Sequence, residues 1–133
     1  MGTLKEKFQD PPKEQGSVPL WFWNQDVAHL SRLSQEEFEK MKEQTREIMK
    51  RSFQNSGYAG FGILPSGNRL RGFVGQYVFE EERFFQLYEI ALQTAKEYHM
   101  QMAFYDEYGW PSGAAGGLVE RDYPQYTTRR LGK

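Results

Sequence analysis

Two adjacent carboxylates and a tryptophan are the residues of this sequence best suited to chemistry. Asp106 and Glu107 directly follow the apolar run 102–105 (MAFY), and Trp110 comes three residues later. Paired carboxyl groups are what glycoside hydrolysis requires on either side of the scissile bond. Neighbouring residues of an extended chain, however, point to opposite faces. We therefore expect that Asp106 and Glu107 do not form one acid–base pair.

Composition allows a carbohydrate site but disfavours most other chemistries. Aromatic residues make up 16% of the 133 residues, which fits either an aromatic core or rings that stack on sugars. No cysteine is present, so disulfides and thiolate chemistry are excluded. The two histidines, His29 and His99, are not spaced as a zinc-binding pair, and we predict no metal site. A nucleophile with an adjacent base is not apparent either.

Charge and hydropathy argue against nucleic acid and membrane partners. The formal net charge is −1, and the basic residues are scattered. No run approaches the roughly 20 apolar residues of a membrane helix. The first 13 residues are polar and lack the apolar core of a secretory signal. We predict no nucleic acid partner, no membrane contact and, for the chain as given, a cytoplasmic location.

Two amphipathic segments are expected to form the main helices. Residues 34–55 begin with Ser34 and Glu37, which are spaced as a capping box, and their apolar positions recur every three or four residues. Residues 80–99 show the same period after three glutamates. Negative charge is favoured in a first helical turn, so we interpret that acidic triplet as a helix start rather than a metal site.

Three apolar runs are expected to form strands. Residues 18–23 (VPLWFW), 58–64 (YAGFGIL) and 102–105 (MAFY) lack the alternation of a half-exposed strand, which predicts strands buried on both faces. Residues 1–17 contain two adjacent prolines and a glycine, and we expect an extended N-terminal arm. The domain would then span residues 18–133.

The alternation of strands and helices predicts an α/β fold, β-α-β-α-β with parallel strands. A doubly wound dinucleotide fold would carry G-x-G-x-x-G after its first strand, but Asn24 and two polar residues stand there instead. The chemically rich loops all follow strand C-terminal ends, whereas the loops before the strands are short and plain. This asymmetry favours part of a TIM-type (β/α) barrel.

Three stretches carry a resemblance to a known family. Residues 21–24 (WFWN) and 60–63 (GFGI) resemble the first two barrel strands of α-L-rhamnosidase-like glycoside hydrolases. Residues 105–113 (YDEYGWPSG), followed by Gly116-Gly117 and Tyr123-Pro124, look like the third-strand segment of the same family. The resemblance covers residues 18–131. It implies a catalytic (β/α)8 barrel that releases deoxysugars or related sugars from polysaccharides, often in a secreted or periplasmic protein.

The resemblance implies which residues bind substrate. One of Asp106 and Glu107 would contact a sugar hydroxyl or stabilise a transition state, although Asp106 could instead cap the turn and accept loop amides. Trp110 would stack on a sugar or pack inside its loop. Asn24 would bind a hydroxyl or, by preference, cap the first crossover. We predict Asn24, Asp106, Glu107 and Trp110 as substrate-binding residues and leave the catalytic residues unknown. Arg69 and Arg71 would suit an acidic sugar, but solvated loop arginines are commoner.

Three functions remain open from the sequence. A complete barrel takes about 250 residues, so we expect an N-terminal fragment of a glycoside hydrolase that binds carbohydrate but is inactive alone and needs the C-terminal half of the barrel. The alternative is a non-catalytic carbohydrate-binding or interaction module that completes its sheet as a homodimer. A small α/β enzyme with chemistry of its own ranks last. Some similar enzymes depend on calcium, but this segment does not support a calcium site, and we predict no cofactor.

Overall fold

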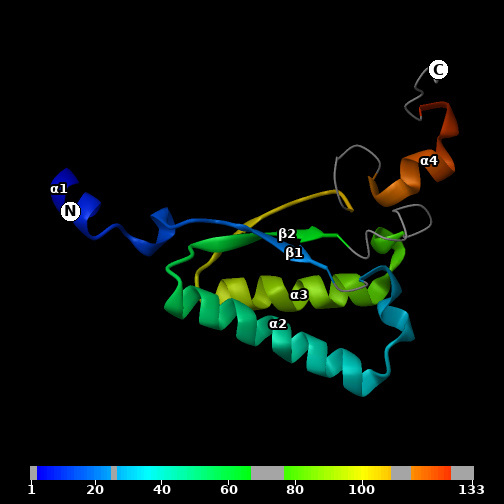
Figure 1. Ribbon diagram of the computed structural model, residues 1–133, viewed down its shortest axis with the longest axis horizontal. Helices are drawn as coiled ribbons and strands as arrows, with labels where there is room; N and C mark the ends of the chain where they lie inside the picture. Colours follow the sequence, from blue (N-terminus) through cyan, green and yellow to red (C-terminus); the bar gives the residue numbers. More distant parts are fainter. Residues whose placement is uncertain (1–2, 25–26, 67–76, 109–114, 127–133) are drawn as a thin grey trace.

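The computed structural model describes residues 3–24, 27–66, 77–108 and 115–126, and Figure 1 shows their arrangement. Three strands and two long helices form the body, with shorter helical segments around them. In chain order the elements are α1 (Leu4–Gln9), η1 (Lys13–Gln15), β1 (Leu20–Trp23), η2 (Val27–Arg32), α2 (Gln35–Asn55), β2 (Gly60–Pro65), η4 (Val78–Glu80), α3 (Glu82–Glu97), β3 (Gln101–Ala103), η5 (Ala115–Gly117), α4 (Leu118–Asp122) and η6 (Pro124–Tyr126), where η denotes a 3-10 helix.

The strands form one parallel sheet in the order β1-β2-β3. Leu20 pairs with Gly62 across the first two strands, and Gly60 pairs with Gln101 across the second two. Both long helices lie on the same side of this sheet, next to each other (Figure 1). The predicted α/β fold with parallel β-α-β-α-β topology is therefore confirmed in the form of an open three-stranded sheet.

Only the central strand is buried on both faces. All six residues of β2 are buried, whereas Leu20 and Phe22 of β1 are 51% and 39% exposed. In β3, Gln101 and Ala103 are exposed. The prediction of three fully buried strands was thus wrong for β1 and β3. These two are edge strands, and their alternate side chains point to the face of the sheet opposite α2 and α3.

The core lies between the sheet and the two long helices. Trp23 is fully buried, and its ring packs edge-on against Phe84 and at a steep angle against Tyr88, both from α3, with centroids 6.0 Å apart in each pair. Phe61 and Ile63 of β2 extend this layer. Burial raises the pKa of the Tyr88 phenol, because the phenolate would lose its hydration there.

The predicted start of the first long helix is confirmed atom by atom. Ser34 N donates to Glu37 Oε2 over 2.8 Å, and Glu37 N donates to Ser34 Oγ over 3.2 Å, which is the reciprocal bonding of a capping box. The Ser34 hydroxyl also donates to Glu37 Oε2 over 2.8 Å. The hydrogen bonds from the Ser34 amide and hydroxyl to this carboxylate lower the pKa of Glu37. α2 then runs to Asn55, and Gly57 follows with a φ of +66°.

Removing the Ser34 hydroxyl tests this cap. Ser34→Ala should lower the free energy of unfolding by about 1 kcal/mol, because the Glu37 amide loses its acceptor. Ser56→Ala is the matched control, since at the other end of α2 the capping bond comes from the backbone N–H of Ser56. Urea unfolding of both variants checks the prediction, and equal losses would contradict it.

The second long helix starts later than its acidic triplet suggests. Glu80 belongs to η4, Glu81 is the N-cap, and only Glu82 lies in the first turn of α3. The carboxylate of Glu81 instead accepts the backbone N–H of Ser31 over 2.7 Å. Glu80 pairs with Arg121 of α4 through two hydrogen bonds of 2.7 and 2.8 Å. Glu80 and Glu81 therefore connect the start of α3 to α4 and η2, and only Glu82 lies in the first helical turn as predicted.

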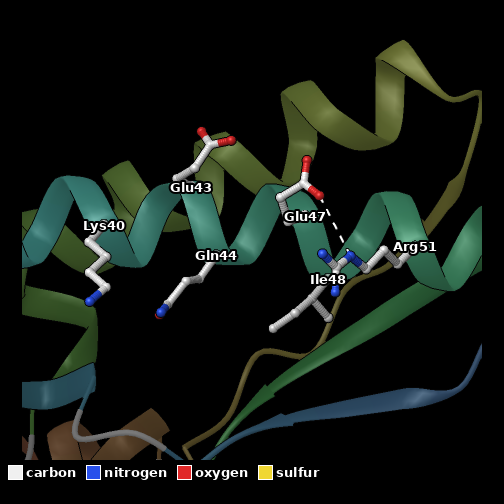
Figure 2. A pocket seen from close by; sticks show the side chains of 6 residues that line it. All are labelled: Lys40, Glu43, Gln44, Glu47, Ile48 and Arg51. Atoms are coloured by element: carbon white, nitrogen blue, oxygen red, sulfur yellow. Dashed lines mark ion pairs between the residues drawn. The ribbon is translucent and has the colours of Figure 1, made fainter.

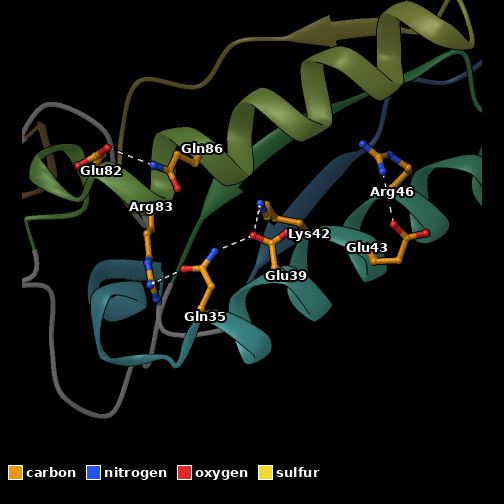
Figure 3. A network of polar contacts seen from close by, with 8 residues as sticks. All are labelled: Gln35, Glu39, Lys42, Glu43, Arg46, Glu82, Arg83 and Gln86. Atoms are coloured by element: carbon orange, nitrogen blue, oxygen red, sulfur yellow. Dashed lines mark hydrogen bonds and ion pairs between the residues drawn. The ribbon is translucent and has the colours of Figure 1, made fainter.

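Arg83 joins the starts of the two long helices (Figure 3). Its guanidinium donates to the carbonyls of Leu30 and Leu33, over 3.0 and 2.6 Å, and to Gln35 Oε1 over 3.2 Å. The same group lies 4.8 Å from the ring centroid of Phe38. Because the carbonyls belong to η2 and its exit, this one side chain fixes the turn between β1 and α2 against α3.

The N-terminal arm was predicted to be extended, and this was wrong. Leu4–Gln9 forms a helix whose N-cap Thr3 accepts the Glu6 amide, while Glu6 accepts the amide of Thr3 over 2.7 Å. The arm thus contains the same Ser/Thr-x-x-Glu signal that identified α2. Pro11 and Pro12 separate this helix from η1, since proline cannot continue the hydrogen-bonding pattern. Among the described residues, no helix has the length and apolar character needed to cross a membrane.

Candidate functional site

The C-terminal ends of the parallel strands define the candidate site. β1 ends at Trp23 and β2 at Pro65, and the two are paired in register. The segments η2, η4, η5 and α4 gather at this end of the sheet (Figure 1). In parallel α/β folds, binding sites lie at this edge because the variable loops leave the strands there.

Asn24 lies at this edge, directly after β1, and is exposed. Residues 25–26, which would show whether Asn24 caps the first crossover, are outside the described residues. Trp110, Arg69 and Arg71 also lie outside them. The roles predicted for Asn24 and for these three residues therefore stay predictions.

Glu107 is a buried loop anchor. Its side chain is 2% exposed. Oε1 accepts the backbone N–H of Tyr108 over 3.0 Å and that of Gly116 over 2.6 Å, and Oε2 accepts that of Ala115 over 2.9 Å. The sequence suggested such amide bonding for the neighbouring Asp106, but Glu107 provides it. The carboxylate thereby joins the two ends of the segment that contains Trp110.

Asp106 is exposed, in contrast to its neighbour. This difference agrees with the expectation that the two side chains point to opposite sides. Next to them, the pKa of Tyr105 is raised, first by burial and then by the negative charges of Glu107 and Asp106.

Two buried donors at the same edge were missed from the sequence. Trp23 Nε1 and Ser66 Oγ are both buried and have no hydrogen-bond partner among the described residues. Trp23 is the last residue of β1, and Ser66 follows β2, its amide donating to the Trp23 carbonyl over 3.0 Å. Unpaired buried polar atoms are costly, and are often satisfied by a ligand or ordered water. The signal available in the sequence was the Pro65-Ser66 pair after an apolar run.

The structure brings the described candidates to one edge but not into one cluster. Asn24 follows β1 and Asp106 follows β3, with β2 between them. Two strand spacings separate their backbones by about 10 Å. His99, by contrast, lies at the opposite end of the sheet, just before β3, with a φ of +53°.

The surface of α2 holds a concavity, which none of the candidate residues lines (Figure 2). Its volume is 470 Å³, and its lining is mostly charged, with Arg51 and Glu47 paired over 3.7 Å. Such alternating charges are typical of a solvated helix face. In the described ranges, no three histidine or carboxylate side chains are grouped so as to hold a metal ion.

Comparison with known proteins adds no relative. No known family, no curated protein and no solved structure matches the chain.

Proposed function

We propose that this chain is the N-terminal part of a glycoside hydrolase barrel of the α-L-rhamnosidase type, in which it forms part of the sugar-binding edge. The winding of the sheet supports a barrel, because successive parallel strands are added on the same side and both crossover helices cover one face. The first half of a dinucleotide-binding fold has the same order of strands and helices. However, the glycine-rich phosphate-binding sequence of that fold does not follow β1 in this chain.

The anchoring of the Trp110 segment by Glu107 is the observation that carries this proposal. A carboxylate that accepts three backbone amides holds both ends of a loop at the strand C-terminal edge. In this proposal Trp110, which lies in the sequence between the two anchored positions, is the residue that stacks on the sugar. In this proposal Glu107 positions the loop, whereas Asp106 and Asn24, both exposed, hydrogen-bond to sugar hydroxyls.

The proposal assigns no acid–base pair to this chain. Asp106 and Glu107 are adjacent, and Glu107 is committed to backbone amides, so they do not flank one glycosidic bond. The catalytic carboxylates would then come from later strands of the barrel. The chain alone would bind sugar but would not hydrolyse an aryl rhamnoside used as a test substrate.

Titration with L-rhamnose, followed by amide NMR shifts, tests the proposed site. The expected shifts cluster at Asn24, Asp106 and the 115–117 segment. Asp106→Asn should weaken binding roughly 10-fold, because a charge-assisted hydrogen bond becomes a neutral one. Glu43→Gln, on the exposed face of α2, is the control and should bind like the unmodified chain. Shifts confined to α2, or no shifts up to the solubility limit of rhamnose, would refute the proposal.

One observation favours a second function, a non-catalytic module that completes its sheet by dimerising. The face of the sheet opposite the helices exposes Leu20 and Phe22, and Ala103 on β3 is exposed beside them. In a barrel this face would be the interior, whereas in an isolated module a second copy would cover it. Self-association that Phe22→Ser abolishes would favour this alternative.

A further inference from the structure

Ser66 carries a buried hydroxyl at the end of the central strand. The residue is 1% exposed, and its Oγ has no hydrogen-bond partner among the described residues. It directly follows Pro65, the last residue of β2. Burial of a hydroxyl without a partner costs free energy, and such groups in native proteins commonly mark a bound water, a ligand or a functional role. We therefore expect a bound molecule to complete the hydrogen bonding of Ser66.

The ladder between the first two strands places Ser66 beside Asn24. Further down this ladder, Gly62 pairs with Leu20, and the Gly62 amide donates to the residue before Leu20. In the same way, the amide of Ser66 donates over 3.0 Å to the carbonyl of Trp23, the residue before Asn24. Asn24 is thus the neighbour of Ser66 across the sheet, one strand spacing of about 5 Å away.

Both residues belong to the face of the sheet opposite the helices. Gly62 marks that face, because a Cβ there would meet side chains of Leu20 and Ala103, on the two neighbouring strands. Side chains at even spacing along a strand share a face, so Ser66 lies on the side of Gly62. The other unpaired donor, Trp23 Nε1, belongs to a ring that packs against rings of α3. It is therefore on the helix face and takes no part in this pair.

The chemistry of the pair fits a neutral ligand with hydroxyl groups. A serine hydroxyl and an asparagine amide can each donate and accept, as a sugar hydroxyl can. Neither β1 nor β2 contains a charged residue, so these strands offer no opposite charge to an ion. Phe22, two residues before Asn24 on the same face, is 39% exposed and provides an apolar contact for the C–H groups of a sugar ring.

We propose that Asn24 and Ser66 bind two adjacent hydroxyl groups of one sugar ring, with Phe22 against the apolar side of that ring. The inference rests on the function proposed above and adds Ser66 to its substrate-binding residues. Ser66 takes the inner position because it is buried, and the exposed Asn24 takes the outer one. The backbone bond to Trp23 and the fixed φ of Pro65 hold Ser66 in place before the sugar binds, which reduces the ordering cost of binding.

Removal of the Ser66 hydroxyl should weaken sugar binding without weakening the fold. In Ser66→Ala, the dissociation constant for L-rhamnose, measured by amide NMR titration, should rise at least about 5-fold because one hydrogen bond to the sugar is lost. The midpoint of urea unfolding without sugar should stay the same or rise, since no described group bonds to that hydroxyl. Asn24→Ala should raise the dissociation constant to a similar extent.

Thr94→Val is the matched control, because it also removes a buried hydroxyl. Thr94 is 1% exposed, but its Oγ1 donates to the Ile90 carbonyl over 2.7 Å within α3. The rhamnose affinity of this variant should be unchanged.

The outcomes separate this inference from the function on which it rests. If the unmodified chain binds rhamnose and Ser66→Ala binds it equally well, the proposed function stands and the inference is overturned. A lower urea midpoint of Ser66→Ala with unchanged affinity would also overturn it and would assign the hydroxyl to a structural water. Equal losses of affinity in Ser66→Ala and Thr94→Val would show that the effect is not local to the pair. A chain that binds no rhamnose would overturn both proposals.

Discussion

Gly60→Ala is expected to separate β3 from the sheet and to lower the free energy of unfolding by about 3 kcal/mol or more, at the upper end of the cost of overpacking. A Cβ at this position would overlap the carbonyl oxygen of Gln101 and lie 2.6 Å from its carbonyl carbon. Both atoms belong to the backbone of the partner strand, so no change of rotamer relieves the contact. Urea unfolding, followed by tryptophan fluorescence, measures the loss.

Gly62→Ala is the matched control, two residues along the same buried strand. There a Cβ would meet Leu20 Cδ2 at 2.9 Å and Ala103 Cβ at 3.3 Å. Leu20 is half exposed and its flexible side chain can turn away, so the loss should stay below about 1.5 kcal/mol. Equal losses for the two variants would show that close backbone approach at Gly60 is not what sets the spacing of β2 and β3.

Glu107→Ala is expected to lower the free energy of unfolding by about 3 kcal/mol or more. The substitution leaves three backbone N–H groups without their acceptor, and an unsatisfied buried donor costs roughly 1–3 kcal/mol. Glu107→Gln should be intermediate, because the amide keeps the shape and one oxygen but can no longer accept from all three donors. Unfolding measurements give the stability, and hydrogen exchange of the Ala115 and Gly116 amides should accelerate in both variants.

Asp106→Ala provides the comparison for Glu107, since Asp106 is the exposed neighbour. A surface substitution of this kind changes stability by less than about 0.5 kcal/mol. The two substitutions separate two roles. Glu107 variants should lose both the protection of the Ala115 and Gly116 amides and the affinity for sugar. Asp106 variants should lose affinity for sugar but keep that amide protection. A stable, normally exchanging Glu107→Ala chain would contradict the anchoring role.

Capping-box sequences mark the start of two of the helices. Ser34 and Glu37 located the start of α2 to the residue, and the same pattern at Thr3 and Glu6 forms α1 inside an arm that its prolines had suggested was extended. α3 begins at Glu82, two residues later than predicted, because Glu80 and Glu81 bind partners far away in the sequence. No local pattern encodes such contacts.

Burial and site geometry were less predictable. An apolar run such as residues 18–23 does not reveal whether its strand lies at the centre or the edge of a sheet, and Phe22 proved exposed. The sequence marked Asp106 and Glu107 as the chemically interesting pair. It could not tell which of the two turns inward, because that depends on where the chain returns at Ala115 and Gly116. Ser66 was missed for the same reason, since its burial arises from packing of distant segments.

The register of the sheet has a consequence for how the chain folds. Each strand pair joins residues about forty positions apart in the sequence, as Leu20 with Gly62 and Gly60 with Gln101. Neither ladder can begin to form until a whole helix has been enclosed between its strands, and closing such long segments is slow. During synthesis on the ribosome, one edge of β2 therefore stays unpaired until Gln101 emerges. We expect chaperones to bind this exposed strand edge in the meantime.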